Sequence, residues 1–159
     1  MLRPLMLLLL LLLVSPVFAA ADDVLVDKAW LRESVPGQDA ASLQLNLTTM
    51  KAATLVAVTS PRANAIKIQR LTRGRGNVKA NTVESLRLAP RRALAFGAAN
   101  YALMMVGLKQ PLNVGDRVPV SLTVQFADKR TQTITVEAEV HPLELSYKHY
   151  NEREVYDRR

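Results

Sequence analysis

The sequence predicts an all-β protein, an antiparallel β-sandwich in preference to a barrel. Two observations carry this prediction. Many short segments alternate apolar and polar residues, which is the pattern of strands that bury one face. Turn residues separate these segments, and no window of comparable length shows the 3.6-residue period of an amphipathic helix.

The first 21 residues are expected to be a signal peptide. Arg3 precedes an unbroken apolar run over residues 5–14, and the alanines at 19–21 offer a cleavage site. Ten apolar residues form about 15 Å of helix, roughly half of a bilayer's hydrocarbon thickness, so no transmembrane span is expected in the mature protein. No cysteine is present to carry a lipid anchor. The mature chain is therefore expected to be secreted, into the periplasm.

The expected domain is the β-sandwich over residues 22–146, followed by a polar, mobile tail over residues 147–159. Leucines alternate with polar residues over 42–47, and a turn follows the apolar run that ends at Val58. Further on, Ile66 and Ile68 alternate with Lys67 and Gln69, which places Gln69 on the face opposite the isoleucines.

A basic, glycine-containing turn is predicted at residues 72–77. The alternating runs over 118–126 and 131–140, joined by a short polar link, predict a hairpin. Pro119 cannot donate to a strand ladder, so its strand is expected to begin at an edge.

Positive charge is concentrated in the middle of the chain. The formal net charge is +7, and between Pro61 and Arg92 only one acid, Glu84, accompanies the basic residues. These are Arg62, Lys67, Arg70, Arg73, Arg75, Lys79, Arg87, Arg91 and Arg92. The cluster is compatible with a solvated strand face or with an acidic protein partner, for which Arg62, Lys67, Arg70, Arg73, Arg75 and Lys79 are the candidate contacts. Aromatic content of 5% and the lack of a nucleic-acid motif argue against nucleic acid.

Enzymatic catalysis is not expected. The two histidines, His141 and His149, lie at or after the last predicted strand, without a nearby serine and aspartate. The absence of cysteine excludes thiol catalysis, thiolate metal sites and disulfides. The glycines of residues 73–76 lack the spacing and the Lys-Ser/Thr ending of a phosphate-binding loop.

Several segments resemble the PCu(A)C-type periplasmic copper chaperones. The most specific is Tyr101-Ala-Leu-Met-Met-Val-Gly-Leu-Lys-Gln-Pro-Leu112, which continues into residues 115–118 and the strand 122–126. Further similarity includes residues 29–32 with Pro36-Gly37, and Ser60-Pro61, and the resemblance is looser near residues 38–54. The resemblance spans most of residues 24–140 and implies a cupredoxin-like, immunoglobulin-like β-sandwich.

In that family two histidines and two methionines hold Cu(I), because thioether and imidazole ligands suit a soft ion that must be released again. By position, these ligands correspond to Gln69, Ala80, Ala102 and Met104, with the spacing Gln69-x10-Ala80-x21-Ala102-x-Met104. Only Met104 keeps its type. The resemblance therefore implies a copper-protein frame whose usual Cu(I) site has been lost, and no cofactor is expected.

Two routes to residual copper binding remain open at this stage. Met104 could pair with Met50 if the fold brings them together, and His141 with His149 could bind Cu(II). Met105 is expected to point to the face opposite Met104.

Two functions follow from these observations. The first is a non-enzymatic protein of copper handling or cytochrome oxidase copper-centre assembly, acting on a periplasmic partner such as an oxidase-assembly component. The second is a metal-independent adaptor that binds an acidic protein through the basic face.

Overall fold

A computed structural model describes residues 23–98 and 100–143. The expected signal peptide and the expected C-terminal tail, including His149, lie outside these residues. No helix among the described residues is long and apolar enough to cross a membrane.

The described chain consists of β-strands joined by turns, which confirms the all-β prediction. In chain order the strands are β1 (Val24–Arg32), β2 (Ala40–Thr49), β3 (Ala53–Thr59), β4 (Ala63–Arg73), β5 (Val78–Val83), β6 (Leu86–Leu88), β7 (Leu94–Phe96), β8 (Tyr101–Leu108), β9 (Arg117–Phe126) and β10 (Thr131–His141).

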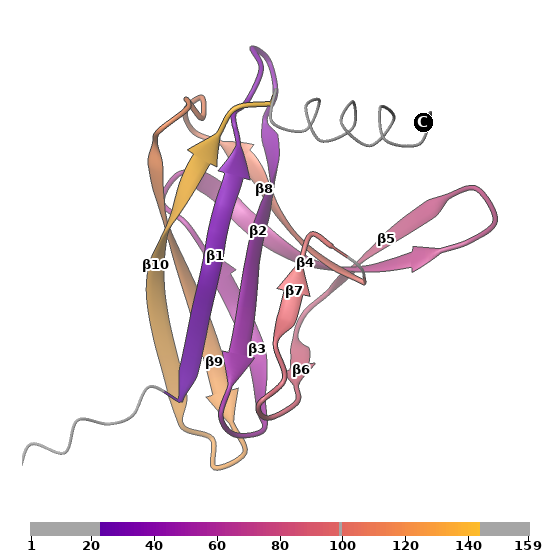
Figure 1. The fold of residues 1–159 in the computed structure, drawn as a ribbon, viewed down its shortest axis with the longest axis vertical. Coiled ribbons are helices and arrows are strands. Elements are labelled where there is room, and N and C mark those ends of the chain that lie inside the picture. Colours follow the sequence, from indigo (N-terminus) through magenta and orange to yellow (C-terminus); the bar gives the residue numbers. More distant parts are fainter. Residues whose placement is uncertain (1–22, 99, 144–159) are drawn as a thin grey trace, which may run out of the picture.

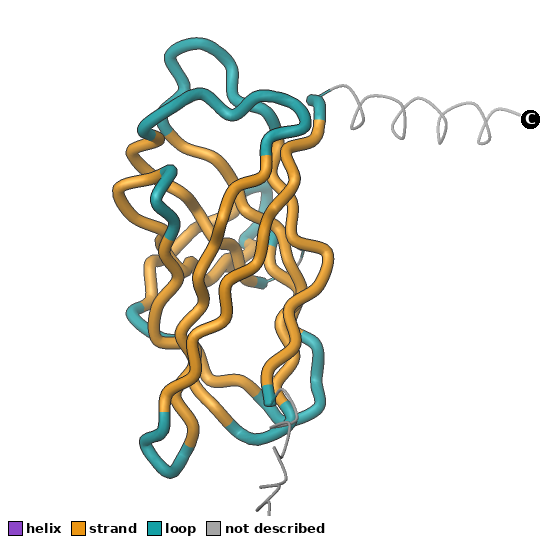
Figure 2. Tube along the Cα trace, turned by 90° about the vertical axis from the view of Figure 1, so that its left-hand side faces the viewer, coloured by secondary structure: helices purple, strands orange, loops and turns teal. Residues whose placement is uncertain are grey.

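The strands form one curled sheet in the order β5-β4-β8-β2-β1-β10-β9-β3-β6, and β7 pairs with β2 (Figure 1). The strands β3 and β4, which stand near opposite ends of this order, contact one another, so that the sheet nearly closes on itself. Figure 2 shows the turns gathered mainly at the two ends of the long axis. The all-β domain expected from the sequence is thus built as one nearly closed mixed sheet.

The interior follows directly from the period-2 pattern. On β9 every second residue from Val118 to Phe126 is buried, and on β2 the leucines at 43, 45 and 47 are buried while their neighbours are half-buried or exposed. The predicted hairpin is present, with Ile134 opposite Leu122 and Val136 opposite Val120. The apolar residues of each alternating segment thus point to the same side and form one core enclosed by the curled sheet.

One pairing departs from the antiparallel expectation. The first and last described strands, β1 and β10, pair in parallel, with Leu31 beside Val140. Alternation predicts which face of a strand is buried but carries no information on the direction of its neighbour, so this parallel contact could not be read from the sequence.

Pro119 lies on β9, which has neighbours on both sides in the sheet. At Pro119 itself, only the β10 side is paired. Its neighbour on β10 is Glu137, whereas β3 pairs with β9 only from Ser121 onward. The expectation of an edge therefore holds for this part of β9, although not for the whole strand.

The far halves of β4 and β5 form a hairpin that extends away from the body, as Figure 1 shows. All of β5 except Val83 is exposed, and β4 has no buried residue after Ile68. Below we call residues 70–83 the arm.

At the other end of β4, Arg62 is held by the turn before β9. Its guanidinium donates to the carbonyl oxygen of Pro111 at 3.0 Å and to the carboxylate of Asp116 at 3.2 Å. The backbone N–H of Asn113 also donates to Asp116. These hydrogen bonds, that of Asn113 first, lower the pKa of Asp116 below its ordinary value of 3.8.

Truncation of the core should destabilise the fold strongly. Leu122 has no exposed surface, and we expect Leu122→Ala to lower the free energy of unfolding by about 2–5 kcal/mol, because buried apolar contacts are lost and a cavity remains. Urea unfolding followed by circular dichroism measures this. Val114, which is 52% exposed, provides the control, since Val114→Ala should change stability by less than about 0.5 kcal/mol.

The Asp116 carboxylate should make the fold sensitive to acid. Because its pKa is lowered in the folded state, its stabilisation is fully present above pH 3.8 and is lost as the pH falls through the folded-state pKa. We expect Asp116→Asn to reduce the fall in urea midpoint between about pH 5 and 2. Asp23, whose pKa is also lowered, first by a hydrogen bond from Lys51, leaves a remaining acid dependence in the variant. Identical pH profiles for the two proteins would contradict this assignment.

Candidate functional site

The four positions aligned with the copper ligands share one face of the sheet. Gln69 on β4 lies directly opposite Ala102 on β8, and Met104 on β8 lies opposite Lys67 on β4. Ala80 on β5 lies opposite Leu71, two residues after Gln69 on the same face. Cross-strand partners point to the same side, so the register of three strands gathers these positions into one patch. We call it the outer patch.

The opposite face of the same strands belongs to the core. Leu103 and Met105 have no exposed surface, and Ile68 is buried opposite Leu103. This confirms two predictions: Gln69 lies on the other face of its strand from Ile66 and Ile68, and Met105 lies on the other face from Met104.

The connection between β7 and β8 lies against this region. Gly97 adopts φ +90°, and a Cβ there would come within 2.7 Å of Cγ of Gln44 on β2, so the glycine allows the backbone to pack on that side chain. On the other side, the backbone N–H of Leu71 donates to the carbonyl oxygen of Asn100 at 2.7 Å. The guanidinium of Arg73 donates to the carbonyl oxygen of Ala98 at 3.3 Å. The loop thus bridges β2 and β4 beside Ala102.

Of these four positions, one carries a soft donor of the kind that suits Cu(I), the thioether of Met104. Ala80 is exposed and Ala102 buried, and neither methyl group can coordinate a metal. Gln69 is half-buried and offers an amide oxygen, a hard and weak ligand for a soft ion. Met104, also half-buried, is the one thioether in the outer patch, and its cross-strand neighbour is the cation Lys67. Among the described residues no three His, Cys, Asp or Glu side chains gather into a metal-binding group.

The fold does not bring Met50 and Met104 together. Met104 lies opposite Ser42 on β2, whereas Met50 follows the end of that strand and is 44% exposed. Eight residues of extended chain separate Ser42 from Met50, a distance of roughly 26 Å. A copper site that combines Met50 with Met104 is therefore excluded by this geometry.

His141 lies on another part of the sheet surface. Its ring stacks on Trp30 with a centroid distance of 5.4 Å and an interplanar angle of 14°. Three strand spacings, from β8 through β2 and β1 to β10, separate Met104 from the histidine's strand, about 14 Å. The stacked pair had no signal in the sequence, because residues 30 and 141 meet only through the parallel β1–β10 contact.

The predicted basic contacts do not form a single face. Arg62 stands about 36 Å along β4 from Arg73 and is paired with Asp116. Within the arm, Arg73 projects on the side of the outer patch, whereas Arg70 and Lys79 project on the other side, as their register with Asn81 and Thr72 requires. Arg75 lies in the turn at the tip of the arm. Of the basic residues from 62 to 92, Arg62 alone forms an ion pair with an acid in the described part of the chain.

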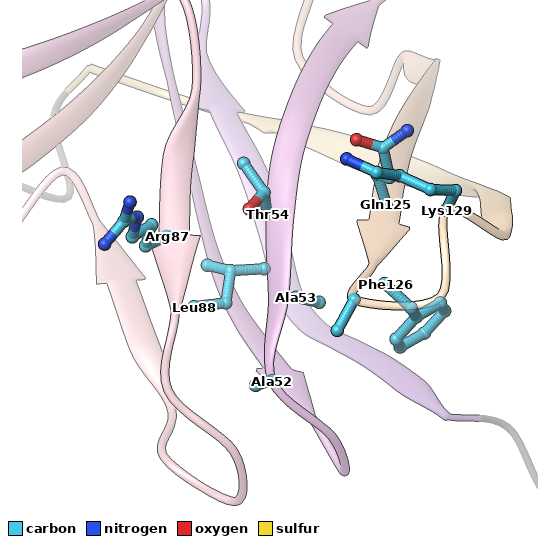
Figure 3. Close-up of a pocket in the computed structure, with 9 residues that line it drawn as sticks. Ala52, Ala53, Thr54, Arg87, Leu88, Gln125, Phe126 and Lys129 are labelled. Carbon is cyan, nitrogen blue, oxygen red and sulfur yellow. The ribbon is translucent and has the colours of Figure 1, made fainter.

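Two concave places border β6. The first, of about 280 Å³, lies where Thr54, Leu88 and Gln125 come together (Figure 3). Figure 3 shows the side chains of Arg87 and Lys129 on opposite sides of it rather than converging on a common point. The second cavity, of about 330 Å³, is lined by Arg87, Arg92, Ala93, Leu94, Asn100 and Tyr101, among others. The guanidinium of Arg70 lies 5.9 Å from the ring centroid of this same Tyr101.

Solved structures of copper-related domains share this fold. The "Copper-bound PCuAC domain from PmoF2" superposes with a TM-score of 0.62 and 16% identity, covering 77% of this chain and 96% of that domain. The "Apo PCuAC domain from PmoF1" gives a TM-score of 0.60 at 16% identity over 76% of this chain and 94% of that one. For "CuI-DR1885" from Deinococcus radiodurans the values are 0.57 and 24%, over 77% of this chain and 80% of that one. At these identities the likeness establishes the fold: a PCuAC-type β-domain.

A relative in sequence is the protein named "Putative lipoprotein Lxx21020" from Leifsonia xyli subsp. xyli. It is 27% identical over 117 residues, which cover 73% of this chain and 69% of the relative. The family model described as "Putative lipoprotein LpqE-like" matches residues 24–140. This span runs from the first residue of β1 almost to the end of β10. The chain therefore belongs to the LpqE-like family.

Proposed function

We propose that this chain is a non-enzymatic protein of copper-chaperone type that has lost the usual Cu(I) site and acts in copper handling or oxidase assembly through a protein partner. The observation that carries the proposal is the outer patch. Its register keeps Gln69, Ala80, Ala102 and Met104 on one face, while a single soft donor remains there. The structural neighbours, which are named as PCuAC domains and as copper-bound forms, support the copper connection.

The proposed location is outside the cytoplasm, in the periplasm. The apolar leader supports export, and the family and the sequence relative are both described as lipoproteins. Within this location we propose the secreted form.

The loss of donors should be reversible by substitution. If the frame is intact, Gln69→His, Ala80→Met and Ala102→His together place two imidazoles and two thioethers on one face. We expect this triple variant to bind one Cu(I) at least about a hundredfold more tightly than the wild type, measured by competition with a chromogenic Cu(I) chelator.

The matched control adds Met104→Ala to the triple variant and should weaken its Cu(I) affinity again. In the wild type, Met104→Ala should leave the weak affinity unchanged. Wild-type protein that already binds one Cu(I) tightly, and loses it with Met104→Ala, would overturn the proposal. A triple variant that stays weak would instead show that the three strands do not hold the ligand geometry.

A second candidate function is a metal-independent adaptor that binds an acidic protein. The specific observation in its favour is the unpaired charge of the arm, where Arg70, Arg73, Arg75 and Lys79 form no ion pair among the described residues. The lining of the neighbouring cavity by Arg87 and Arg92 extends this positive surface. An arrangement of this kind attracts an acidic surface without help from a metal.

Binding of this second kind should depend on salt and on the arm. We expect acidic proteins captured from a periplasmic extract at low salt to be released as ionic strength rises, because exposed charges are screened. The double variant Arg73→Glu with Arg75→Glu should lose the same proteins, identified by mass spectrometry. Arg117→Glu, an exposed arginine on β9 away from the arm, is the control and should retain them. Retention by the double variant would rule out the adaptor reading.

A further inference from the structure

The strand β5 forms one end of the sheet. Among the described residues it pairs with β4 alone, and five of its six residues are exposed. Sheet edges are normally protected by proline, by several charges, by a bulge or by a covering segment, because their free backbone groups recruit other strands. β5 has no proline and carries one charge, Lys79, and Val78 is 59% exposed. The arm therefore presents an open edge well away from the body (Figure 1).

The direction of the backbone groups on this edge follows from two hydrogen bonds. The N–H of Leu71 donates to Asn100, on the side of β4 away from β5. In an antiparallel ladder, residue pairs alternate between those that exchange hydrogen bonds and those whose backbone groups point apart. The pair Leu71 and Ala80 must therefore be of the second kind, and the N–H and C=O of Ala80 point away from β4.

The turn at the tip leads to the same assignment. The N–H of Gly74 donates to the carbonyl oxygen of Asn77 at 2.9 Å, so these residues form a hydrogen-bonded pair. The next pair, Arg73 with Val78, is then non-bonded, and alternation continues along the strand. Val78, Ala80 and Thr82 consequently display their N–H and C=O groups on the free edge.

Charge indicates what kind of strand the edge would take. Lys79 projects from β5 itself and Arg75 lies in the turn at the tip, so the charge along the edge is positive. The guanidiniums of Arg73 and Arg70, on β4, lie toward the carbonyl oxygen of Ala98 and the ring of Tyr101 instead. No acid lies between residues 63 and 83. An added strand whose carboxylates all lie on the face of Lys79 would meet this cation, whereas a second copy of the basic arm would be repelled.

We propose that the β5 edge is a docking site for an extended acidic segment of a partner protein, which adds to the sheet as an outer antiparallel or parallel strand. Main-chain hydrogen bonds to Val78, Ala80 and Thr82 hold the segment, and Lys79 and Arg75 select its charge. This inference rests on the adaptor reading of the proposed function and specifies how the partner is bound.

The test uses an acetylated, amidated ten-residue peptide of alternating glutamate and valine, with alternating lysine and valine as the control peptide. In the wild type, hydrogen exchange followed by NMR should show new protection at the amides of Val78, Ala80 and Thr82. The amides of Lys79 and Asn81, which already bond to β4, should change little. The lysine peptide should produce no protection.

Substitution of Ala80 supplies an independent readout. Ala80→Pro removes the outward N–H without removing a β4–β5 hydrogen bond, and should weaken binding of the glutamate peptide about three- to tenfold. Ala80→Val keeps the N–H and should bind as the wild type does. The amide signal of Leu71 reports whether the arm stays folded in each variant.

The possible outcomes separate this inference from the proposed function. Peptide binding that Lys79→Glu abolishes, but that gives no alternating protection and is unaffected by Ala80→Pro, would overturn strand addition while leaving the charge-based adaptor in place. A dimer in sedimentation experiments without peptide, lost with Ala80→Pro, would show that a second copy occupies the edge and would also overturn it. Absence of any binding by the glutamate peptide would count against both.

Discussion

The register of β4 between β5 and β8 is the constraint on which the functional geometry depends. It places Gln69 opposite Ala102 and Lys67 opposite Met104, and it places Ala80 on the same face through Leu71. The same register buries Ile68 against Leu103 on the other face. A shift of one residue would turn these apolar side chains outward and the outer patch inward. The core therefore fixes where the four positions lie, whatever residues occupy them.

Because the core lies on one face of these strands and the outer patch on the other, the residues of the outer patch can change without loss of the fold. Gln69, Ala80 and Met104 lie outside the buried apolar core of the described domain, and Ala102 contributes only a buried methyl group. Replacing an exposed methionine or histidine by alanine on the outer face removes a ligand but little packing. The outer patch and the arm can thus change function while the curled sheet persists, and the β5 edge, which includes Ala80, stays available for backbone contacts.

The alternation of apolar and polar residues within each segment was enough to predict most of the strands. The leucines of β2, the hairpin of β9 and β10 and the outward placement of Gln69 all follow from a period of two residues. Contacts between distant segments had no such signal. The parallel pairing of β1 with β10, the stack of Trp30 on His141 and the pairing of Arg62 with Asp116 each join residues separated by more than fifty positions. The basic cluster was visible in sequence, but its division between two faces of the arm required the register.

The most direct measurement of the central claim is a Cu(I) titration of the mature protein with 13C-labelled methionine methyl groups, assigned by Met104→Leu. One equivalent of chelator-buffered Cu(I) should leave the Met104 methyl resonance where it is, because the surrounding amide, methyl groups and ammonium cannot complete a coordination sphere. A stoichiometric shift of that resonance, saturating at one copper per chain, would contradict the account.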